Sequence, residues 1–174
     1  MDVLIVVDMQ NDFVTGTLGS SLAEKIVIPL KEYLNSLKED TYVIFTRDTH
    51  DESYMESNEG LHLPIPHCLF NTWGWQIVDE LKDFKYNRII NKPNFGIGSG
   101  TWRNILKDID VKSITLVGLC TDICVISNVL MIQAIYGQDK NVDVRVIENC
   151  CAGVTPELHK SAIDVMKSCQ ITIK

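Results

Sequence analysis

Three residues whose side chains could act together in covalent catalysis lie at predicted strand ends. Asp8 and Lys92 each end a strand, and Cys124 lies in the first turn of a predicted helix that follows another strand. The free N–H groups and positive dipole end of a helix N-terminus favour a thiolate over a thiol. Asp8 could then take the thiol proton while Lys92 stabilises the anion, which gives the nucleophile, base and orienting group of covalent catalysis.

Each of the three residues also has an ordinary structural interpretation. An Asp at a strand end commonly forms a turn, a Lys before Pro is commonly solvated, and a Cys in an apolar helix commonly packs in the core. Their placement at three strand ends of one sheet brings the catalytic interpretation level with the structural one. Cys120 is the rival nucleophile, and it ranks below Cys124 because it ends the strand outside the field of the helix terminus.

A second group of polar residues could hold a metal ion. Asp48 and His50 follow the second predicted strand, where side chains at i and i+2 point the same way and can reach one ion. A third ligand from the following loop, such as His67, would leave positions open for water or substrate, as catalytic zinc sites do. Two His and one carboxylate also suit iron or manganese. The alternative is a set of polar loop residues without a metal.

Other histidines, cysteines and aromatic residues have weaker signals. Phe13, Trp73 and Trp75 could stack on a flat substrate, although the two Trp could equally cover the edge of the core. His62 is a spare candidate for a metal ligand, and His159 is expected to be solvated. Cys68 is expected to pack in the interior, and Cys150 and Cys151 are expected to be buried thiols.

The elements that must position these residues follow from the hydrophobic pattern. Short β-branched runs alternate with longer helical patterns, which is typical of parallel strands joined by helical crossovers. Strands are predicted at residues 2–8, 41–47, 87–92, 113–119, 142–148 and 170–173. Helices are predicted at residues 21–39, 73–83, 101–109, 122–138 and 156–168.

We expect an α/β fold: a three-layer, doubly wound sheet of six mainly parallel strands in the Rossmann-like order 3-2-1-4-5-6, in a single domain over residues 1–174. In that order the first and fourth strands are neighbours at the switch point, so Asp8 and Cys124 would face one another. The predicted helix 122–138 is apolar nearly all round. Part of it could therefore pack against a second copy, which predicts a homo-oligomer.

Composition excludes several classes of protein. The 174 residues are 45% hydrophobic and 22% charged, which argues against disorder, collagen and coiled coil. The net charge of −7 comes without a Lys/Arg cluster, so neither nucleic acid nor an anionic membrane is an expected partner. No apolar stretch is long enough for a membrane span, and no export signal is recognisable. We expect a cytoplasmic protein whose six cysteines are thiols.

Five motifs, spread over nearly the whole chain, resemble the isochorismatase-like cysteine hydrolases, and within that family the nicotinamidases. In chain order they are Asp8-Met9-Gln10-Asn11-Asp12-Phe13, Arg47-Asp48-Thr49-His50, Leu63-Pro64-Ile65-Pro66-His67-Cys68, Lys92-Pro93-Asn94-Phe95-Gly96 and Gly118-Leu119-Cys120-Thr121-Asp122-Ile123-Cys124-Val125. The resemblance implies an amidase with an Asp8, Lys92, Cys124 triad. It implies hydrolysis of a small carboxamide, nicotinamide to nicotinate and ammonia, through a cysteine thioester, as a step of NAD recycling.

The resemblance also implies how the substrate is held. A divalent metal, zinc with iron or manganese as alternatives, would be bound by Asp48, His50 and His67 and would bind the ring nitrogen of a pyridine carboxamide. Phe13 would stack on the ring. A cis peptide between Leu119 and Cys120 would place the backbone N–H groups of Cys120 and Cys124 as an oxyanion hole.

One departure from the family pattern leaves the substrate open. Nicotinamidases commonly carry a Trp three residues before the loop His, where this chain has Pro64; Trp73 or Trp75 would have to substitute. The alternatives are a related cysteine hydrolase of a ureido, carbamoyl or other small amide, and a non-catalytic metal-binding or ligand-binding family member. A dinucleotide-binding Rossmann domain is set aside, because no glycine follows Asp8 in the first turn.

Overall fold

A six-stranded parallel sheet organises the chain, and the computed structural model describes all residues from 1 to 174. Its strands are β1 (Asp2–Val7), β2 (Tyr42–Asp48), β3 (Arg88–Lys92), β4 (Ser113–Leu119), β5 (Asp143–Ala152) and β6 (Thr172–Ile173). The order β3-β2-β1-β4-β5-β6 confirms the predicted topology. All five strand pairings are parallel, so the loops at the carboxyl ends of the strands lie along one edge of the sheet.

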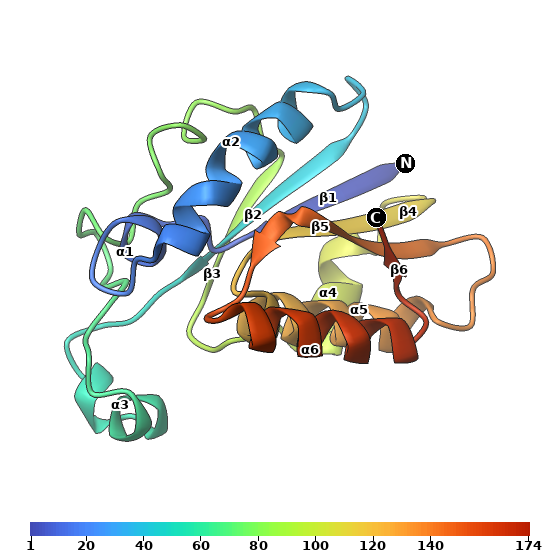
Figure 1. The fold of residues 1–174 in the computed structure, drawn as a ribbon. Coiled ribbons are helices and arrows are strands. Elements are labelled where there is room, and N and C mark those ends of the chain that lie inside the picture. Colours follow the sequence, from blue (N-terminus) through green and yellow to red (C-terminus); the bar gives the residue numbers. More distant parts are fainter.

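Helices cover both faces of this sheet, which confirms the three-layer arrangement (Figure 1). On one face lies α2 (Ser21–Asn35), preceded by the short α1 (Asn11–Val14). On the other face lie α4 (Ser99–Leu106), α5 (Ile126–Tyr136) and α6 (Pro156–Ser168). The helix predicted at 122–138 starts later than expected, because residues Thr121–Val125 form a π-helical turn before α5.

The core lies around the two central strands. Every residue of β1 from Val3 to Val7 is at most 1% exposed, and β4 is buried along its whole length. Their apolar character on both faces is what a strand between two helical layers requires. One continuous cluster of 37 buried apolar residues joins these strands to the helices on both faces.

The helix predicted at 73–83 is wrong. The backbone groups of this segment bind the loop after β1 instead of one another: Asn11 N–H donates to Gln76 O at 2.9 Å, and Val78 N–H donates to Met9 O at 3.0 Å. Gly74 packs so closely on the Asp12 carboxylate that a Cβ would lie 2.1 Å from it. The apolar spacing that mimics a helix therefore belongs to a chain laid along residues 9–12, followed by turns.

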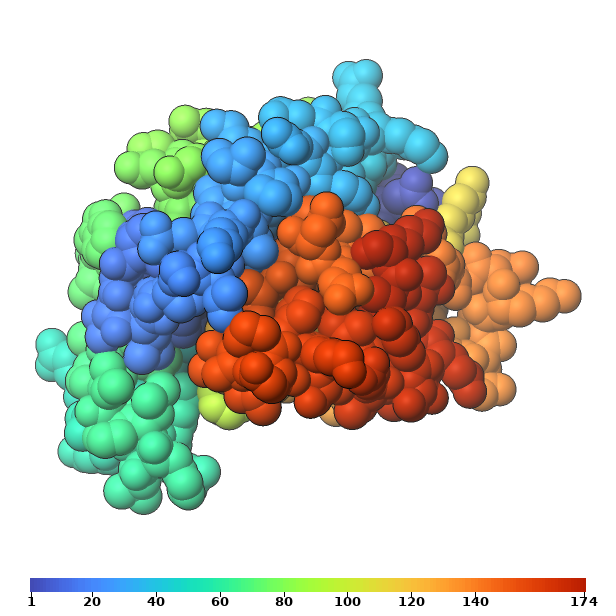
Figure 2. Space-filling model, in the orientation of Figure 1, coloured from blue at the N-terminus to red at the C-terminus, as the bar shows by residue number.

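The connection between β2 and β3 makes an excursion away from the sheet. It contains a 3-10 turn (Tyr54–Glu56) and α3 (Asn58–His62), which form the lobe that stands out from the molecule in Figures 1 and 2. The Ser57 hydroxyl accepts from Gly60 N–H at 2.9 Å and caps α3. This excursion carries several of the predicted site residues.

Close backbone packing shapes the switch point between β1 and β4. Gly118 has φ +116°, and a Cβ there would lie 2.1 Å from the carbonyl oxygen of Val7. Only glycine fits such a conformation and approach. Asp8, directly after β1, is also left-handed, with φ 49°, a conformation that Asp adopts more readily than most residues. No helix of the structure has the length and apolar character needed to cross a membrane.

Candidate active site

Lys92 is the centre of the site. It ends β3, its side chain is 2% exposed, and its Nζ lies 2.6 Å from Asp8 Oδ2 and 3.3 Å from Asp48 Oδ1. The same ammonium donates to Cys124 Sγ at 3.6 Å and to Asn94 O at 3.1 Å. The three residues predicted to act together therefore meet at one buried cation.

Asp8 is held from the neighbouring strand. The Thr46 hydroxyl of β2 donates to Asp8 Oδ1 at 2.7 Å, which leaves Oδ2 facing Lys92. Burial raises the pKa of the Asp8 carboxyl, and the charge of Lys92 opposes that rise. Because Asp8 is fully buried, it can exchange a proton only with the groups that surround it.

Cys124 lies in the π-helical turn that precedes α5, and Asn128 holds this turn. The Asn128 amide donates to Cys124 O at 2.8 Å and to Phe95 O at 3.1 Å, and it accepts from Ile97 N–H at 2.9 Å and Trp102 Nε1 at 3.2 Å. One fully buried side chain thus connects the cysteine to the loop after Lys92.

Opposing effects act on the thiol of Cys124. Burial, and then the nearby Asp8 carboxylate, raise the pKa of the Cys124 thiol well above its usual value, and Lys92 offsets only part of this rise. Burial acts to lower the pKa of Lys92, but Asp8, Cys124 and Asp48 together raise it. Burial and the Asp8 carboxylate therefore oppose the thiolate of Cys124, and the Lys92 ammonium favours it.

Asp48, His50, Glu59 and His67 form a second cluster directly beside Lys92, and their ligand atoms all lie within 4.8 Å of one another. His50 Nε2 and His67 Nε2 lie 2.9 and 3.4 Å from Asp48 Oδ2, and 3.7 and 3.6 Å from Glu59 Oε1. His67 Nδ1 bonds to Ile65 O at 2.9 Å, which turns Nε2 toward the carboxylates.

The donor set of this cluster fits a divalent metal. Two imidazole nitrogens and two carboxylate oxygens match the ligands of zinc, iron and manganese. A backbone carbonyl behind a ligating His is also the usual outer partner in such sites. Burial and the charge of Asp48 raise the pKa of Glu59, and a cation between the two carboxylates would remove that repulsion.

A cavity of about 290 Å³ opens onto both groups. Phe13 lines it beside His67, with ring centroids 5.5 Å apart. Leu63 lines it too, whereas Pro64 is exposed. The complete lining is Phe13, Leu18, Asp48, Glu59, Leu63, His67, Phe95, Cys120, Ile123, Cys124 and Val154. The cavity is therefore apolar except where it meets Cys124 and the metal-ligand candidates.

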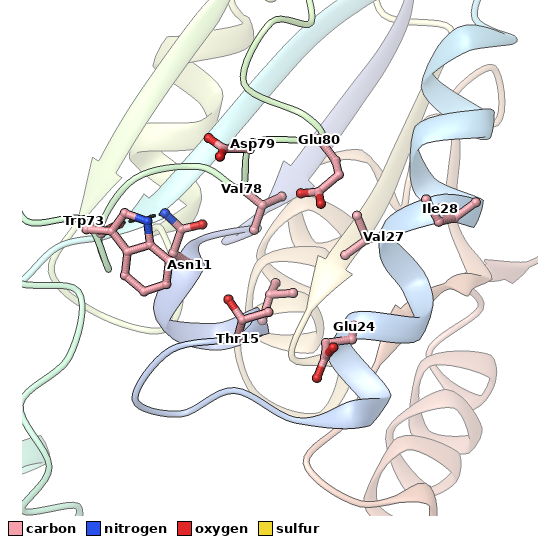
Figure 3. Close-up of a pocket in the computed structure, with 10 residues that line it drawn as sticks. Asn11, Thr15, Glu24, Val27, Ile28, Trp73, Val78, Asp79 and Glu80 are labelled. Carbon is pink, nitrogen blue, oxygen red and sulfur yellow. Dashed lines mark hydrogen bonds between the residues drawn. The ribbon is translucent and has the colours of Figure 1, made fainter.

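Neither Trp73 nor Trp75 lines this cavity, so of the two interpretations given for them the structure does not support stacking on a substrate. Trp75 lies under the Arg47 guanidinium, 3.6 Å from its ring centroid, and donates to Thr49 Oγ1 at 2.9 Å. Trp73 is 58% exposed and borders a separate cavity of about 280 Å³ between α2 and the 73–80 segment, where its carbonyl accepts from Asn11 (Figure 3). That cavity is lined by no cysteine or histidine.

Three other sequence interpretations were tested by position. His62 is exposed and bonds its own helix through Asn58 O, so it is not part of the four-residue cluster. Cys68 is buried, and its N–H donates to Asp12 Oδ2 at 2.8 Å. His159 is not simply solvated, because its Nδ1 lies 2.8 Å from Thr121 Oγ1. All six cysteines are free, and the peptide bond between Leu119 and Cys120 is cis.

Sequence reasoning missed Glu59, Thr46 and Asn128. Glu59 lies on α3, in a stretch without hydrophobic periodicity, eight positions before His67. Thr46 lies inside a strand and Asn128 in the first turn of a helix, and the available signal is a polar residue within a mainly apolar stretch. Such a residue, predicted to be buried, must find partners.

Comparison with known proteins places the chain in a family. The Isochorismatase domain model matches residues 2–173. The chain belongs to this family. A nicotinamidase of Saccharomyces cerevisiae is 29% identical over 123 residues, which are 53% of this chain and 56% of that protein.

Solved structures of family members share the fold. A pyrazinamidase/nicotinamidase of Streptococcus mutans UA159 has a TM-score of 0.87 at 24% identity, over 100% of both chains. A pyrazinamidase of Pyrococcus horikoshii in complex with zinc has a TM-score of 0.80 at 29% identity, over 99% of this chain and 98% of that one.

Asn128 generates a prediction about stability. Asn128→Ala leaves two donors and two acceptors without their partner. We expect it to lower the free energy of unfolding by at least about 3 kcal/mol, since each unsatisfied buried group costs roughly 1–3 kcal/mol. Ser127→Ala, which removes one bond to Ile123 O, should cost under about 1 kcal/mol. Urea denaturation of both variants measures the difference, and equal midpoints would contradict the role of Asn128.

Proposed function

We propose that this family member is a cysteine-dependent amidohydrolase of a small carboxamide, with nicotinamide as the substrate and nicotinate and ammonia as products. The observation that carries the proposal is the single buried ammonium of Lys92, which contacts Asp8, Asp48 and Cys124. It joins a nucleophile and its base to a metal-ligand cluster at one cavity. The activities named for the yeast and Pyrococcus horikoshii relatives support the substrate.

In the proposed reaction, Asp8 takes the proton of the Cys124 thiol as Sγ bonds to the amide carbonyl carbon. The raised pKa of the thiol makes this base necessary. Backbone N–H groups of Cys120 and Cys124 would stabilise the developing oxyanion. The C–N bond then breaks while the leaving nitrogen receives the proton from Asp8. Ammonia departs, and the acyl group stays on Cys124 as a thioester.

Water completes the cycle at the same residues. Asp8 accepts a proton from a water molecule while the water oxygen attacks the thioester carbonyl carbon. The bond between that carbon and Cys124 Sγ then breaks, and the sulfur takes the proton back from Asp8. Lys92 stays charged throughout because two carboxylates surround it, and it keeps Asp8 oriented toward the sulfur. Because the residues exchange one proton in each half, the enzyme returns to its starting state.

Substrate binding would use the metal cluster and the apolar walls. Asp48, His50, Glu59 and His67 would hold a divalent ion, most simply zinc, which would bind and orient a heteroatom of the substrate. Phe13 would stack on a flat ring. Pro64, at the position where the family pattern has a Trp, is exposed, and its neighbour Leu63 lines the cavity, so this wall is aliphatic.

That aliphatic wall favours a second candidate function. A ureido, carbamoyl or other non-aromatic small amide needs only one apolar wall, and the cavity offers Leu18, Leu63 and Ile123. The same triad would act on it. We further propose that residues 1–174 work as one hydrolase domain, in a cytoplasmic homo-oligomer, without nucleic acid or membrane partners.

The first prediction concerns the nucleophile and its base. Cys124→Ala and Asp8→Asn should each lower kcat by at least about 10³-fold, because residues that act as a unit lose most of the rate together. Cys120→Ala should keep kcat within about tenfold, since its side chain does no chemistry in this scheme. Ammonia release with matched thermal melting curves measures this. High activity in Cys124→Ala with loss in Cys120→Ala would exchange their roles.

The second prediction concerns the metal. Elemental analysis of the purified protein should find about one divalent ion per chain, and Glu59→Gln or His67→Ala should reduce occupancy at least about tenfold. His62→Ala, a nearby histidine outside the cluster, is the control and should keep the ion. A metal-free wild type that stays fully active in chelator would rule out the site.

The third prediction concerns the substrate. Nicotinamide and pyrazinamide should be hydrolysed at least about 10²-fold faster than benzamide, which has the same shape but no ring nitrogen to orient. Small ureido and carbamoyl compounds complete the panel. Equal rates on nicotinamide and benzamide would show that the ring nitrogen is not recognised, and faster turnover of a ureido compound would select the second candidate.

A further inference from the structure

A polar chain connects the start of α6 to the loop that carries the two active-site cysteines. Thr121 Oγ1 lies 2.8 Å from His159 Nδ1, and His159 Nε2 lies 3.7 Å from Glu148 Oε1. Thr121 is fully buried, and the His159 side chain is 20% exposed. The Thr121 hydroxyl and the Glu148 carboxylate therefore face the two nitrogens of one imidazole ring.

The next residue of the loop is tied to the same region. Asp122 Oδ1 accepts from Val154 N–H at 3.0 Å. Gly153 is packed between the two contacts: a Cβ there would lie 2.7 Å from Asp122 Oδ1 and 2.8 Å from His159 N. Two consecutive residues, Thr121 and Asp122, are therefore fixed, one by α6 and the other by the segment that joins β5 to α6.

The position of Thr121 shows how it can act. Thr121, His159 and Glu148 have the order of a nucleophile, a base and an acid, as in a hydrolytic triad. Thr121, however, is fully buried and does not line the 290 Å³ cavity. Its neighbours Cys120, Ile123 and Cys124 do line it. The hydroxyl can therefore affect a reaction only through the backbone that it holds.

We propose that His159 is a positioning residue, which through the Thr121 hydroxyl sets the place of the Cys120–Cys124 segment at the reacting carbonyl. This inference rests on the proposed amidase function, because the segment matters if Cys124 and its neighbouring N–H groups act on substrate. A displaced segment would misalign the sulfur and the N–H groups, and with them the side chain of Ile123, while the apolar walls on other elements, Phe13, Leu18 and Leu63, stay in place. The expected signature is a lower kcat with little change in KM.

The test compares paired variants. Thr121→Val keeps the shape of the side chain and removes its hydroxyl, and His159→Leu removes the imidazole ring that binds this hydroxyl. Each variant should lower kcat about tenfold and change KM less than about twofold. Thr121→Ser keeps the hydroxyl, and His159→Asn places an amide near the position of Nδ1, so both should stay within about threefold of wild type. The double variant Thr121→Val/His159→Leu should be no slower than either single variant, because both remove one interaction.

A second readout separates this inference from the proposed function. The rate at which iodoacetamide alkylates Cys124, followed by mass spectrometry, needs no substrate, and it should change at least about threefold in Thr121→Val and His159→Leu but not in Thr121→Ser. Lys160→Ala is the control on the same helix, because its side chain is 81% exposed. If the wild-type protein shows no amidase activity but the variants show these changes in alkylation rate, the proposed function is rejected and the positioning role of His159 is retained. Unchanged kcat and alkylation in Thr121→Val, or multiplicative losses in the double variant, would overturn the positioning role.

Discussion

The buried Lys92 ammonium is the interaction on which the arrangement of the site depends. Removing an ion of this kind from water costs several kcal/mol, so it must be compensated by charged partners held in good geometry. Here the partners are Asp48, which ends the neighbouring strand β2 and is the register partner of Lys92, and Asp8, which follows β1, the strand beyond β2. Strand pairing therefore fixes the positions of these charged side chains. Their mutual attraction in turn stabilises an arrangement in which β1, β2 and β3 end at the same edge of the sheet.

A side-chain amide supports this edge of the sheet where a crossover helix is missing. Gln10 accepts from Asp48 N–H at 2.7 Å and donates to the carbonyl oxygens of Asp48 and Trp75, each at 2.9 Å. It thereby joins the loop after β1, the end of β2 and the segment that leads to β3. Asn128 does the same for the loop after β3 and the turn of Cys124. At the site, two buried side-chain amides therefore bind backbone groups that regular secondary structure would otherwise pair.

Much of the fold and part of the site could be predicted from the sequence, for a physical reason. Apolar runs reveal parallel strands, and polar residues that directly follow them, such as Asp8 and Lys92, must meet at one edge. Glu59 lacked such a signal, because its place depends on how Ser57 and Gly60 fold α3 away from the sheet. The 73–83 segment has helical apolar spacing, but its backbone binds residues 9–12, a long-range choice that local pattern cannot reveal.

The pairing of β1 with β4 has a consequence for synthesis of the chain. The Ser113 hydroxyl binds Asp2 at 2.6 Å across 111 positions of sequence, and Val3 is paired with Ile114. Until β4 emerges from the ribosome, β1 presents an apolar edge with unpaired backbone groups, and such edges recruit other chains. Productive folding must therefore wait for more than half of the polypeptide, and fragments that end before β4 should be captured by chaperones or aggregate rather than persist as a folded intermediate.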